Sequence, residues 1–361
     1  MSRPRASGTK SAPRHARAPR AALLEGLAPL AALAIAFAAG ALFILAIGED
    51  PLAIYALMLH ETLGTGYGLG QTLFKATPLI FTGLAVAFGF RSGLFNIGAE
   101  GQLYLGAFAA ALVGAAWPAG PMPVLLPLAI LAAASAGAAW GAIPGFLKAR
   151  FGAHEVINTI MMNFIAFALV SFIGRGLFEP ATVRTAEIAP GAQLARLSDW
   201  FPALRGAPVN LSLLLGLLCA AAAQVLLFRS RFGYELRAVG LNAPAAEYGG
   251  VRLGRAQTIA MAISGAIAGL GGTNFVLGYK HFFELGFPGG VGFLGIAVAL
   301  VGRNRPLGVV IAAVVFGALS HGGLVINQRV PKELVDILEA IVILSAIAVQ
   351  QIVARIARRL D

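Results

Sequence analysis

Long apolar stretches alternate with short polar ones along almost the whole chain. A helix of roughly 17 to 25 mostly apolar residues can cross a bilayer. The pattern predicts ten such segments, at 23–47, 72–90, 101–117, 123–147, 157–177, 211–228, 256–278, 289–301, 306–319 and 334–353. The segments 289–301 and 306–319 are short for a span, so we expect flanking residues to extend them or the chain to be broken or re-entrant there. The sequence therefore predicts an all-α, polytopic membrane helix bundle of about ten segments.

Composition and charge agree with a membrane protein. Of 361 residues, 58% are hydrophobic and 12% are charged, whereas soluble domains have about 25% charged residues. The net charge of +11 could indicate a nucleic-acid partner, but most basic residues lie in segments that fall on one side if all ten segments cross, namely 1–20, 91, 148–150, 229–255, 303–305 and 355–359. This is the positive-inside bias. We predict no nucleic-acid partner, cytoplasmic N- and C-termini, and an outer position for 178–209.

The first residues are basic, and the apolar run after them extends to about Ile47. That run is too long for a signal-peptide core. We expect a disordered cytoplasmic tail at 1–22 and a transmembrane domain at 23–361.

Several chemistries lack their motifs. The sequence contains neither the phosphate-binding pattern G-x-x-x-x-G-K-[ST] nor H-E-x-x-H. One cysteine, Cys219, excludes an intramolecular disulfide, and the five histidines lack metal-ligand spacing. We expect no enzymatic activity, no metal and no cofactor in this chain.

The stretch FRSGLFNIGAEGQ at 90–102 places polar and small residues between two apolar segments. Such a break is tolerated at membrane depth where it faces a cavity or other protein. Asn96 and Glu100 are therefore candidates for a solute path, or for holding the break together. A carboxylate hydrogen-bonded to an exposed helix N-terminus is an equally simple account of Glu100. Arg91 is expected to lie at the cytoplasmic interface of the membrane and to act as an anchor there.

A second polar group follows in HEVINTIMMNFIA (154–166), where Glu155, Thr159 and Asn163 recur every four residues. They share one helical face, which should point into the bundle for interhelical hydrogen bonds or for contact with a solute. The full set of path candidates is Asn96, Glu100, Asn158, Thr159, Asn163 and Asn274.

The loop FGYELRAVGLNAPAAEYGGVRLGR contains helix-boundary signals. Pro244 suits a first helical turn and Gly249 suits the position after a helix, so a short cytoplasmic helix is expected at 243–248. Its small residues fit a groove on another protein.

Three motifs in order, FRSGLFNIGAEGQLYLGAF, HEVINTIMMNFIA and LRAVGLNAPAAEYGGVR, resemble those of permease subunits of bacterial ABC importers for branched-chain amino acids, ribose and nucleosides. The second motif is similar to that of simple-sugar and nucleoside permeases. The resemblance implies a type II ABC importer-like fold in the bacterial inner membrane. It also implies an ATP-binding subunit that holds ATP and magnesium, a second permease subunit, identical or homologous, and an extracytoplasmic substrate-binding lipoprotein. The ATPase-coupling residues would be Gly240, Asn242, Ala245, Ala246, Glu247 and Gly249.

Internal patterns add two expectations. GAFAAALVG (106–114) is similar to LGIAVALVG (294–302), which suggests an inverted repeat of the kind found in transporters. Glycines at GxxxG spacing, at Gly137, Gly141 and Gly145 and at Gly265 and Gly269, predict close helix packing.

The inventory of the expected path indicates the solute. It offers amides and hydroxyls, and no central Arg or Lys is evident, since Lys75 falls near an outer helix end. We expect a small neutral solute, a nucleoside or related simple sugar, with aromatic rings nearby. An ion-coupled secondary transporter, a branched-chain amino acid or ribose permease, and a membrane scaffold are the alternatives.

Overall fold

The structure is a bundle of helices. The computed structural model describes the backbone of residues 19–360 and, apart from parts of α1 and α14, their side chains. The elements are α1 (Pro19–Ala46), α2 (Pro51–Leu59), η1 (His60–Gly64), α3 (Gly66–Arg91), α4 (Ala99–Ala116), α5 (Met122–Phe151), α6 (Glu155–Gly174), η2 (Pro190–Ala192), η3 (Leu197–Asp199), η4 (Pro202–Leu204), α7 (Ser212–Arg229), α8 (Arg231–Leu241), α9 (Ala243–Tyr248), α10 (Leu253–Leu270), α11 (Thr273–Phe275), η5 (Val276–Lys280), α12 (Val291–Val301), α13 (Pro306–Ile326) and α14 (Lys332–Leu360). Between residues 19 and 360, β-structure is limited to isolated bridges.

The all-α membrane bundle is confirmed, and each predicted apolar segment coincides with a helix. Six described helical segments are long and apolar enough to cross a membrane, namely α3, α5, α6, α7, the run from Leu253 to Lys280, and α13. The count of ten spans is not established by these lengths. Flanking residues extend the predicted segment 306–319, one of the two outcomes expected for it, because α13 continues to Ile326. It does so because His321, Gly322 and Gly323 are buried against other helices.

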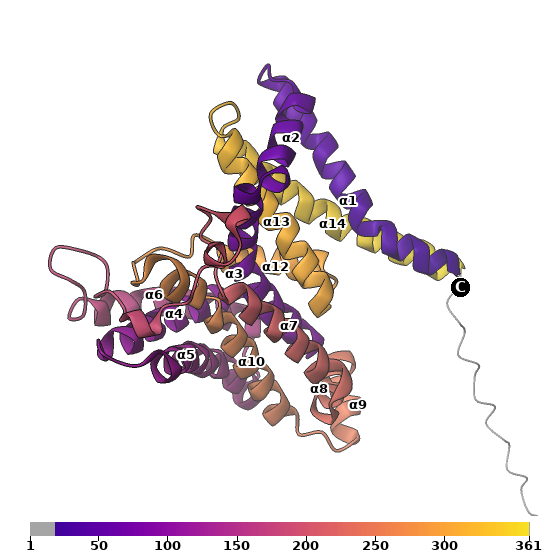
Figure 1. The fold of residues 1–361 in the computed structure, drawn as a ribbon. Coiled ribbons are helices and arrows are strands. Elements are labelled where there is room, and N and C mark those ends of the chain that lie inside the picture. Colours follow the sequence, from indigo (N-terminus) through magenta and orange to yellow (C-terminus); the bar gives the residue numbers. More distant parts are fainter. Residues whose placement is uncertain (1–18, 361) are drawn as a thin grey trace, which may run out of the picture.

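Helix α3 lies at the centre of the bundle (Figure 1), and 83% of its apolar window is buried. It packs against α7, α10, α12 and α13. Helices α1 and α14 run side by side away from this centre as a separate arm (Figure 1). The predicted tail at 1–22 lies mostly outside the described residues, and the described part, from Pro19, is already helical.

Helices α5 and α10 approach each other most closely along their glycines. A Cβ atom added to Gly137 would overlap the carbonyl of Gly265, and one added to Gly141 would lie 3.0 Å from the Gly265 Cα. Small residues one turn apart permit such backbone contact. The close packing expected from the GxxxG spacing is thereby confirmed.

The connecting segments gather at two ends. At one end Arg91 donates to the carbonyl of Asn304, and Gly254 contacts Ala149. At the other end the segment 178–209 pairs with 281–285, with Thr185 N–H donating to Phe283 O at 2.9 Å. The segments around 91, 149, 254 and 304, which the charge pattern places on one side, therefore share one end of the bundle.

Candidate functional site

The break between α3 and α4 is buried and tied to neighbouring helices. The Asn96 side chain is completely buried, and its amide nitrogen lies 2.8 Å from both Gln102 Oε1 and Ser264 Oγ. Asn96 Oδ1 accepts from the Gly98 N–H at 3.0 Å, and Ser264 donates to the Ala85 carbonyl on α3 at 2.6 Å. Asn96 thus connects the break to α4 and α10, and through Ser264 to α3.

Helix α6 supplies the second set of contacts to the break. Thr159 Oγ1 accepts from the Ile97 N–H at 3.2 Å. Asn163 accepts from the Gly101 N–H at 2.9 Å and donates to the Ile97 carbonyl at 3.0 Å. Buried backbone groups outside regular helix need such partners. As expected, this face of α6 points into the bundle, and Glu155 at its start pairs with Lys148 at 2.9 Å.

Glu100 joins the N-termini of two helices. It lies in the first turn of α4, and its Oε1 accepts from the Gly290 N–H at 2.8 Å, while Oε2 accepts from the Gly292 N–H in the first turn of α12. The first N–H groups of a helix lack partners within it, and its N-terminus carries partial positive charge. The Glu100 carboxylate gives partners to the N–H groups at the start of α12, and it lies in the first turn of α4, where negative charge is favoured. Holding a helix N-terminus is one of the accounts that the sequence leaves open for Glu100.

The last two path candidates lie apart from the break. Asn274 is buried and accepts from the Asn210 side chain at 3.2 Å. Asn158 is half-buried, and its amide nitrogen has no hydrogen-bond partner among the described residues. Asn158 thus differs from Asn96, Glu100, Thr159, Asn163 and Asn274, which have partners.

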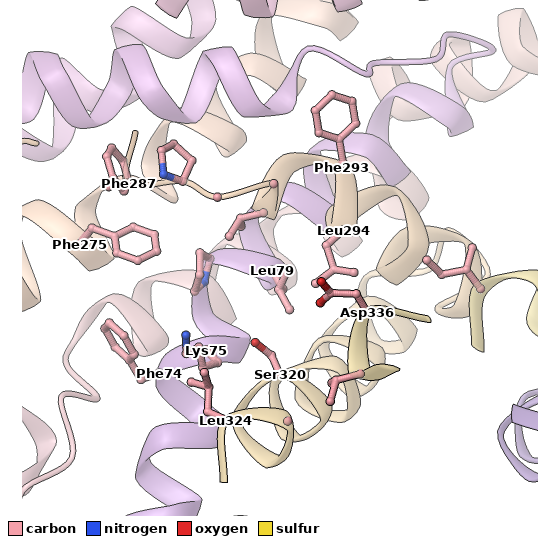
Figure 2. A pocket seen from close by; sticks show the side chains of 18 residues that line it. Phe74, Lys75, Leu79, Phe275, Phe287, Phe293, Leu294, Ser320, Leu324 and Asp336 are labelled. Carbon is pink, nitrogen blue, oxygen red and sulfur yellow. The ribbon is translucent and has the colours of Figure 1, made fainter. Parts of the chain in front are cut away.

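A cavity of about 520 Å³ lies beside the break, between α3, α12, α13, α14 and the segment 287–290 (Figure 2). Three rings form what we call the aromatic wall: Phe74, Phe275 and Phe287. Three side chains form what we call the polar edge: Lys75, Ser320 and Asp336. None of the six path candidates lines this cavity.

The two sides of the cavity have different chemistry. The Phe275 ring lies 4.9 Å from the Phe287 ring and 6.1 Å from the Phe74 ring, centre to centre. In the view of Figure 2 these rings lie on the left, and Ser320 lies between Lys75 and Asp336. The cavity therefore offers apolar ring faces and edges together with hydroxyl, ammonium and carboxylate groups.

The position of Lys75 corrects the expectation that no basic residue is central. Helix α3 begins at Gly66, six residues before the predicted segment. Lys75 thus lies in the third turn of α3, at roughly 3.6 residues per turn, and it reaches the cavity instead of marking an outer helix end. Sequence reasoning missed the cavity because its lining comes from five helices, α3, α11, α12, α13 and α14, and from the segment 287–290.

The short helix expected at 243–248 is present as α9. The Asn242 side chain accepts from the Ala245 N–H at 3.1 Å, and Gly249 follows the last turn. Ala246 is buried, whereas the Tyr248 side chain is 98% exposed. Next to α9, Leu241 at the end of α8 is 88% exposed. Two large side chains, one on α9 and one next to it, are therefore exposed at this end of the bundle.

The region near α9 contacts the break directly. A Cβ atom added to Gly93 would lie 2.8 Å from the Gly240 Cα, and one added to Gly240 would overlap the Arg91 carbonyl. Arg91 Nε donates to the Asn304 carbonyl at 2.9 Å. The end of α8, the break and the turn between α12 and α13 are therefore packed together. The sequence predicted that Arg91 lies at the membrane interface, but it did not predict its hydrogen bond to the Asn304 carbonyl.

No metal or cofactor site is evident in the described part of the chain. Among the described side chains, no group of three or more His, Cys, Asp or Glu residues is placed to hold a metal ion.

Comparisons with known proteins agree with the motifs. A family model described as branched-chain amino acid transport system / permease component matches residues 68–347. The guanosine ABC transporter permease protein NupP of Bacillus subtilis is 41% identical over 326 residues, covering 88% of this chain and 92% of NupP. The guanosine ABC transporter permease protein NupQ of the same organism is 29% identical over 258 residues, covering 68% of this chain and 78% of NupQ.

Relatives named for other solutes are similar over the same length. The nucleoside permease protein NupB of Lactococcus lactis is 33% identical, covering 88% of this chain and 89% of NupB. The glucose permease protein TsgB13 of Haloferax volcanii is 37% identical, covering 88% of this chain and 85% of TsgB13. No solved structure matches the chain.

Proposed function

The chain belongs to the family of branched-chain amino acid transport system permease components and is a permease subunit of an ABC transporter, and from this premise we propose that it serves an ATP-driven importer of nucleosides or related simple sugars. The family name does not decide the solute, because relatives that cover most of the chain are named for guanosine, nucleosides and glucose. The similarity to NupP over 92% of its length carries the proposal.

The energy source is ATP on another subunit. The sequence has no phosphate-binding loop, and α9 is a capped, exposed helix that presents Tyr248 to a partner. In this proposal the ATP-binding subunit docks on Gly240, Asn242, Ala245, Glu247 and Gly249 and holds ATP and magnesium, while the predicted coupling residue Ala246 packs inside the bundle.

The orientation follows from the end of the bundle that carries α9. That end also holds Arg91, Lys148, Arg252 and Arg303, and basic loops favour the cytoplasm. We place it, with both termini, on the cytoplasmic side of a bacterial inner membrane. The segment 178–209 then faces outward, where a substrate-binding lipoprotein would deliver the solute.

The second permease of the complex is a different chain. NupP and NupQ of Bacillus subtilis are both named as guanosine permease proteins, and this chain is 41% identical to NupP but 29% identical to NupQ. A complex with one subunit of each kind accounts for this difference. Co-expression of tagged and untagged copies tests it, because capture of the untagged copy would indicate two identical permeases.

Uptake by cells that express the complete transporter tests the solute. We expect saturable uptake of labelled guanosine or another nucleoside that stops when ATP is depleted. Leucine as sole solute would contradict the neutral-solute proposal. Uptake that survives ATP depletion but ends when the ion gradient collapses would identify a secondary transporter instead.

A variant in α9 and a matched control variant at the opposite end of the bundle test the docking role of α9. Ala245 is exposed on α9, and Ala119 is exposed in the connection between α4 and α5 at the opposite end. Ala245→Arg is expected to abolish transport and release the ATP-binding subunit, while Ala119→Arg retains both. Ala246 is buried, so its replacement would also disturb folding. Normal transport by Ala245→Arg would remove the docking role.

A further inference from the structure

We propose that the cavity is a nucleoside subsite in which the base lies against the aromatic wall and the ribose meets the polar edge. This inference rests on the proposed function and deepens it, because it assigns the two halves of the solute to two sets of residues. Its evidence is the joint presence of three phenyl rings and three hydrogen-bonding side chains around one space.

The size of the cavity suits a small solute. Its volume of about 520 Å³ falls within the range of about 300 to 1,000 Å³ typical of small-molecule sites. Such sites combine mostly apolar walls with a few polar groups that fix orientation.

The aromatic wall matches a base better than a sugar. Aromatic side chains stack on the π-face that every nucleobase has, and this contact tolerates different bases. The Phe275 and Phe287 rings are tilted by 58° to each other, so they form a corner that receives one flat ring. A monosaccharide has no π-face and can contact such rings only through its C–H groups, so the aromatic wall favours a base over a sugar.

The polar edge matches a neutral polyhydroxyl group. Lys75 donates hydrogen bonds, Asp336 accepts them, and Ser320 does both. One positive and one negative side chain line the same space, so the cavity as a whole does not select a charged solute. A lipid chain fits poorly, because charged groups are costly beside hydrocarbon.

Two glycines without side chains, Gly289 and Gly290, form part of the rim of the cavity. Gly289 and Gly290 line it with φ values of 57° and 90°, which favour glycine. A Cβ atom added to Gly290 would meet no atom within 4 Å. The rim therefore leaves room for a solute beside the aromatic wall.

Uptake kinetics of leucine variants test the aromatic wall in the complete transporter. Phe275→Leu and Phe287→Leu keep an apolar side chain and remove the ring. Each should lower kcat/KM for guanosine by at least about fivefold, the lower limit of a base–ring contact, and leave ribose uptake unchanged where the transporter carries it. Phe275→Tyr should retain guanosine uptake. The control is Phe172→Leu, whose ring is 74% exposed on α6.

The outcomes separate this inference from the proposed function. Guanosine uptake that is unchanged in both leucine variants contradicts the aromatic wall and leaves the nucleoside importer standing. Uptake of ribose or glucose without any nucleoside contradicts both. Equal losses for guanosine and ribose would make the rings structural.

Photolabelling of the wild-type transporter tests the subsite even if the leucine variants fail to fold. Membranes containing the wild-type transporter are irradiated with 8-azidoguanosine, and we expect label on peptides from 275–291, reduced by excess guanosine. Label confined to other segments would overturn the assignment.

Discussion

The bundle holds polar side chains in two regions, one of hydrogen-bonded residues around the break between α3 and α4 and one along an open cavity. In the first, which we call the break network, Asn96, Glu100, Thr159 and Asn163 bond to backbone and side-chain groups of the chain itself. In the second, Lys75, Ser320 and Asp336 line an open cavity. The comparison teaches that polar residues in an apolar segment hold irregular backbone together as readily as they contact a solute.

The free energy of unmet polar groups explains the break network. A buried donor or acceptor that loses its partner costs about 1–3 kcal/mol. A break inside a membrane bundle exposes several such groups at once, so nearby helices must supply side chains to satisfy them. The break network should therefore affect stability, while Ser320 in the polar edge should affect transport alone.

The largest expected effect is that of Glu100→Leu. It removes the acceptor of two N–H groups, from Gly290 and Gly292. Hydrogen bonds to a charged group contribute about 1.5–3 kcal/mol each, so we expect a loss of about 3 kcal/mol or more, visible as a lower melting temperature and little folded permease. Glu100→Gln retains one oxygen acceptor and should be intermediate. A Glu100→Leu protein as stable as wild type but inactive would assign Glu100 to the solute path.

The next effect is that of Asn163→Leu, which leaves the Gly101 N–H and the Ile97 carbonyl without their partner. We expect a stability loss of about 1–3 kcal/mol and slower transport at unchanged capture by the binding lipoprotein. Asn158→Leu is the control, because the Asn158 amide nitrogen has no partner to lose. Equal thermal stability of the two variants would contradict the structural role of Asn163.

Gly240→Ala tests the contact between the break network and α8. The added methyl would overlap the Arg91 carbonyl, which must push the end of α8 and the neighbouring α9 away from the break. We expect reduced transport and weaker ATPase stimulation with a smaller loss of stability than in Asn163→Leu. Gly254→Ala is the control, since its methyl would meet the Ala149 Cβ at an ordinary 3.4 Å. Similar transport in both variants would show that this contact carries no coupling.

The sequence predicted features that depend on local pattern. Apolar runs gave the positions of the helices, and Asn242, Pro244 and Gly249 gave the bounds of α9 because caps and turns are local signals. The four-residue spacing of Thr159 and Asn163 gave their inward face for the same reason. The GxxxG pattern likewise predicted close helix packing, which the structure places between α5 and α10.

Features that depend on distant contacts could not be predicted. Glu100 bonds to Gly290, 190 residues away, and no local signal identifies that partner. The cavity brings Lys75 on α3 together with Ser320 on α13 and Asp336 on α14, and none of the three belongs to a recognisable motif. The meeting of the α4 and α12 N-termini at Glu100 is compatible with the inverted repeat, which stays a prediction.

The smallest expected effect is that of Ser320→Ala in the polar edge. Ser320 lies on α13 and lines the cavity together with Lys75 and Asp336. The substitution therefore removes a single hydroxyl group from a site that retains the other two polar side chains. A neutral hydrogen bond contributes about 0.5–1.5 kcal/mol, which corresponds to a rise in KM of about two- to tenfold. Stability should not change, because alanine suits a helix. Uptake kinetics and a melting curve of the same preparation check both statements. A stability loss like that of Asn163→Leu would place Ser320 among the structural hydrogen bonds and end the contrast between the two regions.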